Sequence, residues 1–169
     1  LSFVQAREQL LIGLLFTALA LLIRFALFDF KSDDLNLYYH EWLRHLHENG
    51  GFAAIPTLKS DYTVAYQYLL ALVSYLPWAD VLRIKLISLP FDFGNAILVM
   101  LLVRKAGNYS RTNLIPLIAY GFTLFLPTAF INSALWGQCD AIYTFFSLLM
   151  LYLFLDGKFS GAWISFGLA

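Results

Sequence analysis

The chain has 169 residues, of which 60% are hydrophobic and only 13% are charged, and its formal net charge is zero. Soluble domains average about 45–50% apolar and about 25% charged residues, so too little polar surface remains here to coat a water-soluble globule. The composition therefore predicts an integral membrane protein, and the zero net charge gives no electrostatic basis for a nucleic-acid partner.

The first predicted membrane span covers residues 10–28, which are almost continuously apolar over nearly the 20 or so residues that a crossing helix needs. The polar sequence FDFKSDD follows in place of a signal-peptide cleavage site, so we expect a retained anchor. Near its far end stands Arg24, which we expect to extend its charged head to the membrane surface or to contact a lipid phosphate.

A polar segment over 29–83 carries the densest group of ionisable side chains. Its first part predicts an amphipathic helix on the membrane surface, because apolar residues recur at helical spacing. The stripe consists of Leu35, Tyr38, Tyr39, Trp42, Leu43 and Leu46. Ser32, Asp33 and Asp34 are candidate N-caps, and Asn49-Gly50-Gly51 predicts the end of the helix. The histidines lack the i, i+4 spacing of a helical metal site, and we expect them to be solvated; they are His40, His45 and His47.

We expect further spans over about 85–103, 113–131, 141–155 and from 161 onward, in the N-terminal fragment of one longer membrane domain. Residues 61–78 are ambiguous, because tyrosines and polar side chains dilute an apolar stretch and tyrosine favours the membrane interface. Charge counting addresses this segment, since basic residues mark the cytoplasmic side. The relevant basic residues are Arg7, Arg104, Lys105, Arg111 and Lys158.

All of these basic residues fall on the cytoplasmic side only if 61–78 does not cross the bilayer. We therefore expect residues 29–83 to form one large external loop with interfacial helices. The expected fold class is all-α, a polytopic transmembrane bundle. Asp33 and Asp34 then share the external face with Asp140, which lies in the short polar sequence NSALWGQCD.

A carboxylate at the mouth of a membrane cavity can take a proton from an acceptor hydroxyl while a sugar leaves its phosphate. Asp33 and Asp34 are candidates for this base, and Asp140 is a candidate to assist it. Helix capping is the competing interpretation for all three. Trp136 is expected either to stack on a sugar ring or to anchor the chain at the membrane interface.

Cationic and intramembrane groups complete the candidate site. Arg83 and Lys85, at the outer end of a span, are candidate ligands for a lipid-linked phosphate, with extension to the interface as the alternative. Asp92 lies seven residues after Lys85 on the same helical face, and intramembrane ionisable groups usually face a cavity or a partner. The single cysteine, Cys139, excludes an internal disulfide and is expected to be a small buried apolar residue.

The order of these pieces resembles the bacterial relatives of GPI mannosyltransferase II, within the GT-C superfamily of polytopic glycosyltransferases. The resemblance runs from about residue 29 to 156, through SDDLNLYYHEW, HENGGF, DYTVAYQYLLALVSYL, RIKLISLPFDF and NSALWGQCDAIYTFFSLL. Its most specific part is WGQ-x-D followed by an apolar span, which adds Gln138 to the expected substrate-binding residues. The chain departs from the usual Tyr-Thr-Pro of the family at Tyr62-Thr63-Val64.

The resemblance implies the GT-C membrane fold, a polyprenyl-phosphate-linked sugar donor and transfer that inverts the anomeric centre. It maps the first-loop acid of the family onto Asp34, with Asp33 as alternate, and the second-loop acid onto Asp140. Distant oligosaccharyltransferase subunits use both acids with a divalent metal, whereas lipid-phosphate-sugar enzymes often need none, so the resemblance leaves the metal requirement open. The acceptor is a lipid, a glycan or a protein, and membrane lipids surround the chain.

Three functions follow from these observations. The expected one is a membrane glycosyltransferase, mannosyltransferase-like, whose active site is on the non-cytoplasmic face. The alternative is a transporter or flippase with an intramembrane pathway along Asp92 and Lys85. The third is a non-catalytic membrane subunit that docks a partner through the loop over 29–83.

Overall fold

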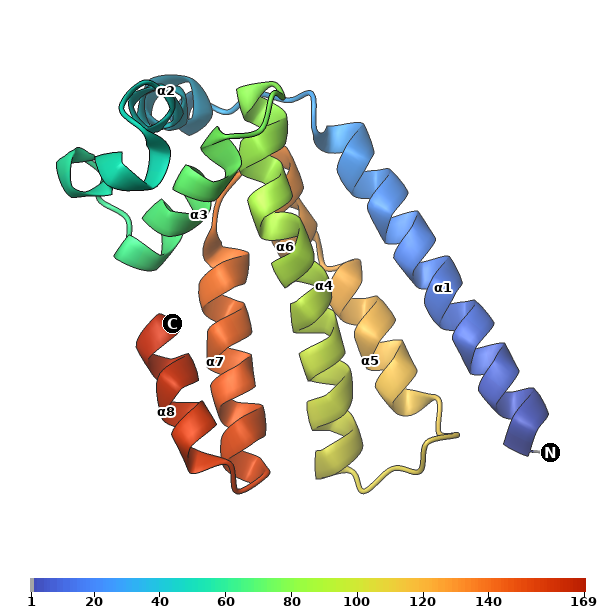
Figure 1. Cartoon of the computed structure of the whole chain (residues 1–169). Coiled ribbons are helices and arrows are strands. Elements are labelled where there is room, and N and C mark those ends of the chain that lie inside the picture. The colour runs from blue at the N-terminus through green and yellow to red at the C-terminus, as the bar shows by residue number, and fades with distance from the viewer. Residues whose placement is uncertain (1) are drawn as a thin grey trace.

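The protein is built from helices alone. The computed structural model describes residues 2–169, with side chains from Val4 onward, and these residues contain no strand. Two helices are long and apolar enough to cross a membrane, α1 (Ser2–Leu27) and α4 (Asp80–Ala106). Helix α4 lies between α5 (Ile115–Leu124) and α7 (Asp140–Leu155) and packs against both, and α1 packs against α5 (Figure 1). The expected all-helical membrane class is therefore supported.

The segment expected as one span over 113–131 is bent. Helix α5 (Ile115–Leu124) is followed by α6 (Pro127–Phe130) and a π-helical turn, η3 (Ile131–Leu135), and the two parts meet at 42°. The bend falls before Pro127, where Leu126 adopts an extended conformation, which proline favours in the residue that precedes it. If the bent pair counts as one span, the chain has three candidates for crossing a membrane.

Two shorter helices, α7 (Asp140–Leu155) and α8 (Phe159–Leu168), pack as a hairpin beside α4 (Figure 1). Lys105, near the end of α4, donates to Asp156 in the α7–α8 turn at 2.8 Å. The start of α1, the α4–α5 turn and the α7–α8 turn thus lie at one end of the bundle (Figure 1). The basic residues used in the charge argument belong to these pieces.

The polar segment occupies the opposite end. It contains a π-helical turn, η1 (Leu35–Tyr39), helix α2 (His40–Glu48), a 3-10 helix, η2 (Gly51–Thr57), and α3 (Val64–Ser74). The 11 residues of α3 span about 16 Å, which is too short for a hydrocarbon core of about 30 Å. Because α3 cannot cross by itself, α1 ends and α4 begins at the same end of the bundle (Figure 1).

The prediction that the apolar stripe forms one buried face is largely confirmed. Five of its six members are buried, and Tyr38 is 52% exposed. Tyr38 lies inside η1, where a π turn holds about one residue more than an α turn and so moves this side chain off the stripe. The helix ends at Glu48, as Asn49-Gly50-Gly51 predicted. Gly51 has a φ of +65°, and a Cβ there would meet the hydroxyl of Tyr75 at 2.1 Å.

Two hydrophobic cores hold these parts in place. The larger lies under the polar segment and joins η1, α2 and α3 to the first turns of α4 and α7. The smaller lies between α1, α4 and α5. Leucines at positions 10, 11, 14, 15 and 22 of α1 remain more than half exposed, as expected of a helix surface that contacts lipid.

Candidate functional site

Four of the expected site residues meet where α1 ends and α7 begins. A cavity of about 370 Å³ is lined by Phe30, Lys31, Ser32, Asp33, Asp34, Trp136 and Gln138. The first five come from the segment after α1, and the last two come from the WGQ-x-D sequence. Segments about one hundred positions apart thus line one cavity, whereas the charge distribution had led us to expect only that they share a face of the membrane.

Ser32, and not Asp34, caps the helix that begins the polar segment. The backbone N–H of Leu35 donates to Ser32 Oγ at 3.3 Å, and Ser32 Oγ donates in turn to the carbonyl of Trp136 at 2.7 Å. Position 34 makes no side-chain cap hydrogen bond. The capping interpretation therefore does not hold for Asp34, whose carboxylate is exposed to the cavity instead.

Gln138 joins Asp34 to two tyrosines. Its Nε2 donates to Asp34 Oδ2 at 2.6 Å, and its Oε1 accepts from the hydroxyl of Tyr62 at 3.0 Å. Tyr39 donates to the Tyr62 oxygen at 3.0 Å, which completes the chain of bonds. Because a carboxylate only accepts, the amide nitrogen of Gln138 must face Asp34, and the carboxylate is held in one orientation.

The two tyrosines act in this chain as neutral donors. Burial raises the pKa of Tyr39 far above its usual range. Burial is also the main cause that raises the pKa of Tyr62, and the negative charges of Asp34 and Asp140 contribute to the same shift. The carboxylates of Asp34 and Asp140 therefore both contribute to the raised pKa of Tyr62. Neither tyrosine was among the predicted site residues, although Tyr62 stands in the motif at which the chain departs from the family.

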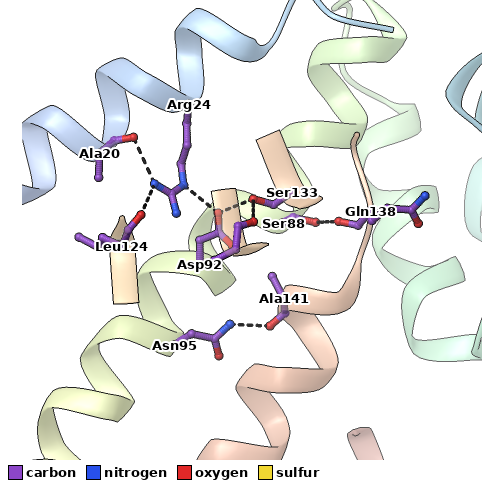
Figure 2. Close-up of polar contacts among 10 residues, drawn as sticks. Ala20, Arg24, Ser88, Asp92, Asn95, Leu124, Ser133, Gln138 and Ala141 are labelled. Atoms are coloured by element: carbon purple, nitrogen blue, oxygen red, sulfur yellow. Dashed lines mark hydrogen bonds and ion pairs between the residues drawn. The ribbon is translucent and has the colours of Figure 1, made fainter. Parts of the chain in front are cut away.

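Local backbone geometry explains the order of residues in WGQ-x-D. Gly137 has a φ of +77°, a region that favours glycine, and this turn follows directly after η3. The turn is fixed at Gln138, whose carbonyl accepts from Ser88 Oγ of α4 at 2.8 Å, as Figure 2 shows. Trp136, on the other side of the glycine, is 51% exposed and lines the cavity.

Asp140 lies at the first position of α7 and is exposed. Its Oδ2 accepts from Asn132 Nδ2 at 2.8 Å, and it makes no side-chain cap for its helix. It does not line the cavity beside Asp34. Asp33 does line that cavity, next to Asp34. Cys139 is fully buried, as expected.

Lys85 and Arg83 are occupied by protein groups. Lys85 Nζ donates to three carbonyls at the end of α1, those of Leu27 at 3.1 Å, Phe28 at 3.0 Å and Phe30 at 2.6 Å. Arg83 pairs with Asp80 and donates to the carbonyl of Ser74. Neither residue lines the cavity of Asp34, whereas Lys31, which the sequence argument did not select, does.

Asp92 is paired inside the bundle, as Figure 2 shows. Arg24 Nε donates to Asp92 Oδ2 at 2.8 Å, and Ser133 Oγ donates to the same oxygen at 2.6 Å. Arg24 also donates to the carbonyls of Ala20 and Leu124. Arg24 is 1% exposed, so both expectations for it, the membrane surface and a lipid phosphate, are replaced by this internal ion pair.

None of the three histidines is simply solvated, and His45 Nε2 is 3.0 Å from Thr57 Oγ1. His40 Nδ1 is 2.5 Å from Asp80 Oδ2, and His47 Nδ1 is 3.0 Å from the carbonyl of Ser74. They connect α2 to the end of α3 and the start of α4. Within residues 2–169, no group of three or more His, Cys, Asp or Glu side chains is placed to hold a metal ion. The metal requirement thus stays an open part of the resemblance.

No protein-family model, no curated protein and no solved structure matches this chain.

Proposed function

We propose that the chain belongs to an integral-membrane glycosyltransferase, mannosyltransferase-like, that moves a sugar from a polyprenyl-phosphate donor to an acceptor hydroxyl. The observation that carries the proposal is the position of Asp34. Its carboxylate is exposed, it is not a helix cap, and it accepts from Gln138 of the WGQ-x-D sequence at 2.6 Å. The two motifs that carry the resemblance therefore meet at the residue to which the resemblance assigns the base.

In the proposed reaction, Asp34 takes the proton of the acceptor hydroxyl as its oxygen attacks the anomeric carbon of the donor sugar. The bond from that carbon to the phosphate oxygen breaks, and polyprenyl phosphate leaves with the electron pair. Attack from the face opposite the phosphate inverts the anomeric centre. Gln138 orients the base, and Asp140 and Trp136 are proposed to contact the substrates.

The cavity beside Asp34 suits the donor end of this reaction. Lys31 supplies a positive charge for the phosphate, and the exposed ring of Trp136 supplies a surface on which a sugar can stack. Lys85 holds the end of α1 in place through its hydrogen bond to the carbonyl of Phe28, and Arg83 holds the start of α4 in place through its ion pair with Asp80. The proposed role of both is thus to position the site rather than to bind the phosphate directly.

The site is proposed to face the non-cytoplasmic side of a multi-pass protein. The turns α4–α5 and α7–α8, which carry basic residues, lie at the end of the bundle opposite the polar segment (Figure 1). Basic residues mark the cytoplasmic side, which supports an external position for the polar segment. A transporter pathway along Asp92 and Lys85 has less support, because the side chains of both residues are bound by protein groups.

The test is a transfer assay with the purified full-length protein and a radiolabelled polyprenyl-phosphate mannose. Asp34→Asn is expected to lower transfer by roughly two to four orders of magnitude, the range typical of a lost general base. Glu48→Gln removes an exposed carboxylate of the same segment and is expected to keep normal turnover. Normal turnover of Asp34→Asn would refute the assignment.

A further inference from the structure

A basic surface covers the end of the bundle opposite the polar segment. It is formed by the last turn of α4, the α4–α5 turn and the α7–α8 turn, which lie at the same end (Figure 1). Its charged side chains are Arg104, Lys105, Arg111, Asp156 and Lys158. Asp156 is the one acid among them, so most of the positive charge is not neutralised within the surface.

One carboxylate joins the two turns. Lys105 Nζ donates to Asp156 Oδ1 at 2.8 Å, and Lys158 Nζ pairs with Oδ2 of the same side chain at 2.7 Å. Lys105 also lies over the ring of Tyr152, 5.7 Å from its centroid. Because α4 is tied to the α7–α8 turn in this way, the basic side chains are held on a common surface and not on independent loops.

The two arginines of this surface have no counter-charge. Neither Arg104 nor Arg111 forms an ion pair in the part of the chain that the structure describes. Arg111 is exposed, and the buried Nε of Arg104 has no hydrogen-bond partner among the same residues. A buried donor without a partner is costly, so an anionic acceptor at Arg104 would be stabilising.

Exposed aromatic rings border the basic surface. Phe154 and Phe159 stand on either side of the α7–α8 turn, are 55% and 56% exposed, and are in edge contact with ring centroids 5.4 Å apart. Lys158 directly precedes Phe159. A positive charge beside an exposed apolar surface matches a molecule with a phosphate at the head of a hydrocarbon chain, whereas a soluble anion would leave the rings uncovered.

We infer that this surface binds an anionic glycerophospholipid, whose phosphate is held by Arg104, Arg111 and Lys158. Its acyl chains then pack against Phe154 and Phe159. Guanidinium groups bind phosphate oxygens through paired hydrogen bonds, and each basic residue beside a membrane span raises the affinity for anionic lipid by about fivefold. The inference is independent of the proposed reaction, because none of these residues lines the cavity of Asp34.

The inference is tested by native mass spectrometry of the purified full-length protein in detergent. The probes are phosphatidylglycerol, phosphatidylcholine with the same acyl chains, and glycerophosphoglycerol, which is the anionic headgroup without chains. We expect phosphatidylglycerol to bind about tenfold more tightly than either of the others. Arg111→Gln is expected to lower this preference by about fivefold, and Asp156→Asn to raise it, because the neutral amide releases two ammonium groups.

Lys59→Gln is the matched control, because it removes an exposed basic side chain from the polar segment at the opposite end, and it should keep the preference. Equal binding of the two lipids, or a preference that survives unchanged in Arg111→Gln, would overturn the inference. Binding of glycerophosphoglycerol as tight as that of the lipid would assign the surface to a soluble anion and would also overturn it.

Discussion

Arg24 donates to Asp92 at 2.8 Å across 68 positions of the chain, and the two side chains are 1% and 3% exposed. The pair joins α1 to α4, and Ser133 on the same carboxylate adds η3 to the contact. In an apolar bundle, each charge is stable only because the other is present. The pair therefore fixes the relative position of the helices that carry the candidate site.

Arg24→Met is expected to destabilise the protein strongly, by about 3–5 kcal/mol, because it leaves the Asp92 carboxylate buried without a counter-charge. The double variant Arg24→Met/Asp92→Asn removes both charges and should recover most of that loss, since the amide oxygen can still accept from Ser133. Thermal unfolding in detergent measures both, with the exposed Arg7→Gln as control. A double variant no more stable than the single one would contradict this account.

Lys85→Met is expected to cost stability before it affects substrate binding. The change removes three hydrogen bonds from one ammonium to carbonyls at the end of α1, and bonds to a charged group contribute about 1.5–3 kcal/mol each. Thermal unfolding should show a clear loss against Lys59→Met, an exposed control. An unchanged melting temperature with a raised KM for the donor would show instead that Lys85 binds the phosphate.

Ser32→Ala is expected to cost about 1 kcal/mol, because it removes the oxygen that accepts from the Leu35 N–H. Ser32→Thr keeps an oxygen in the same place and should retain most of the stability. Asp33→Ala should have a smaller effect than Ser32→Ala, because Ser32 is the cap. Urea unfolding of the three variants provides the comparison, and a larger loss for Asp33→Ala would assign the cap to the aspartate.

The turn between α7 and α8 gives a pH prediction. Hydrogen bonds from Lys105 and Lys158 lower the pKa of Asp156 from 3.8 to about 2. Because the folded pKa is below the unfolded one, these ion pairs stabilise the fold fully above pH 3.8, and the contribution is lost as the pH falls through about 2. Unfolding of the wild type and of Asp156→Asn should differ at neutral pH and converge in strong acid. A gap that stays constant down to pH 2 would disprove the linkage.

Local patterns predicted the parts of the fold that depend on neighbours in the sequence. The apolar stripe marked the buried face of α2, and Asn49-Gly50-Gly51 marked its end. The charge distribution predicted that the acidic segment and WGQ-x-D would share one end of the bundle. Each of these is a property of spacing or of composition.

Contacts between distant positions could not be predicted in this way. The partner of Arg24 is set by helix packing, and three backbone carbonyls that bind Lys85 leave no signature in the sequence. The choice of Ser32 over Asp34 as cap depends on where the first turn starts, and three adjacent candidates cannot be told apart by type.

Two π turns flank the contact between Asp34 and Gln138: η1 begins directly after Asp34 and sets the rotation of α2, and η3 precedes Gln138 and sets the rotation of the turn that carries it. Each turn holds one residue beyond the α-helical repeat, so removal of a residue from either would turn the following part by about 100°. Selection at this site is thereby expected to act on length as well as on identity: a single-codon deletion within η3 would turn Gln138 away from its acid partner even if every remaining side chain were kept.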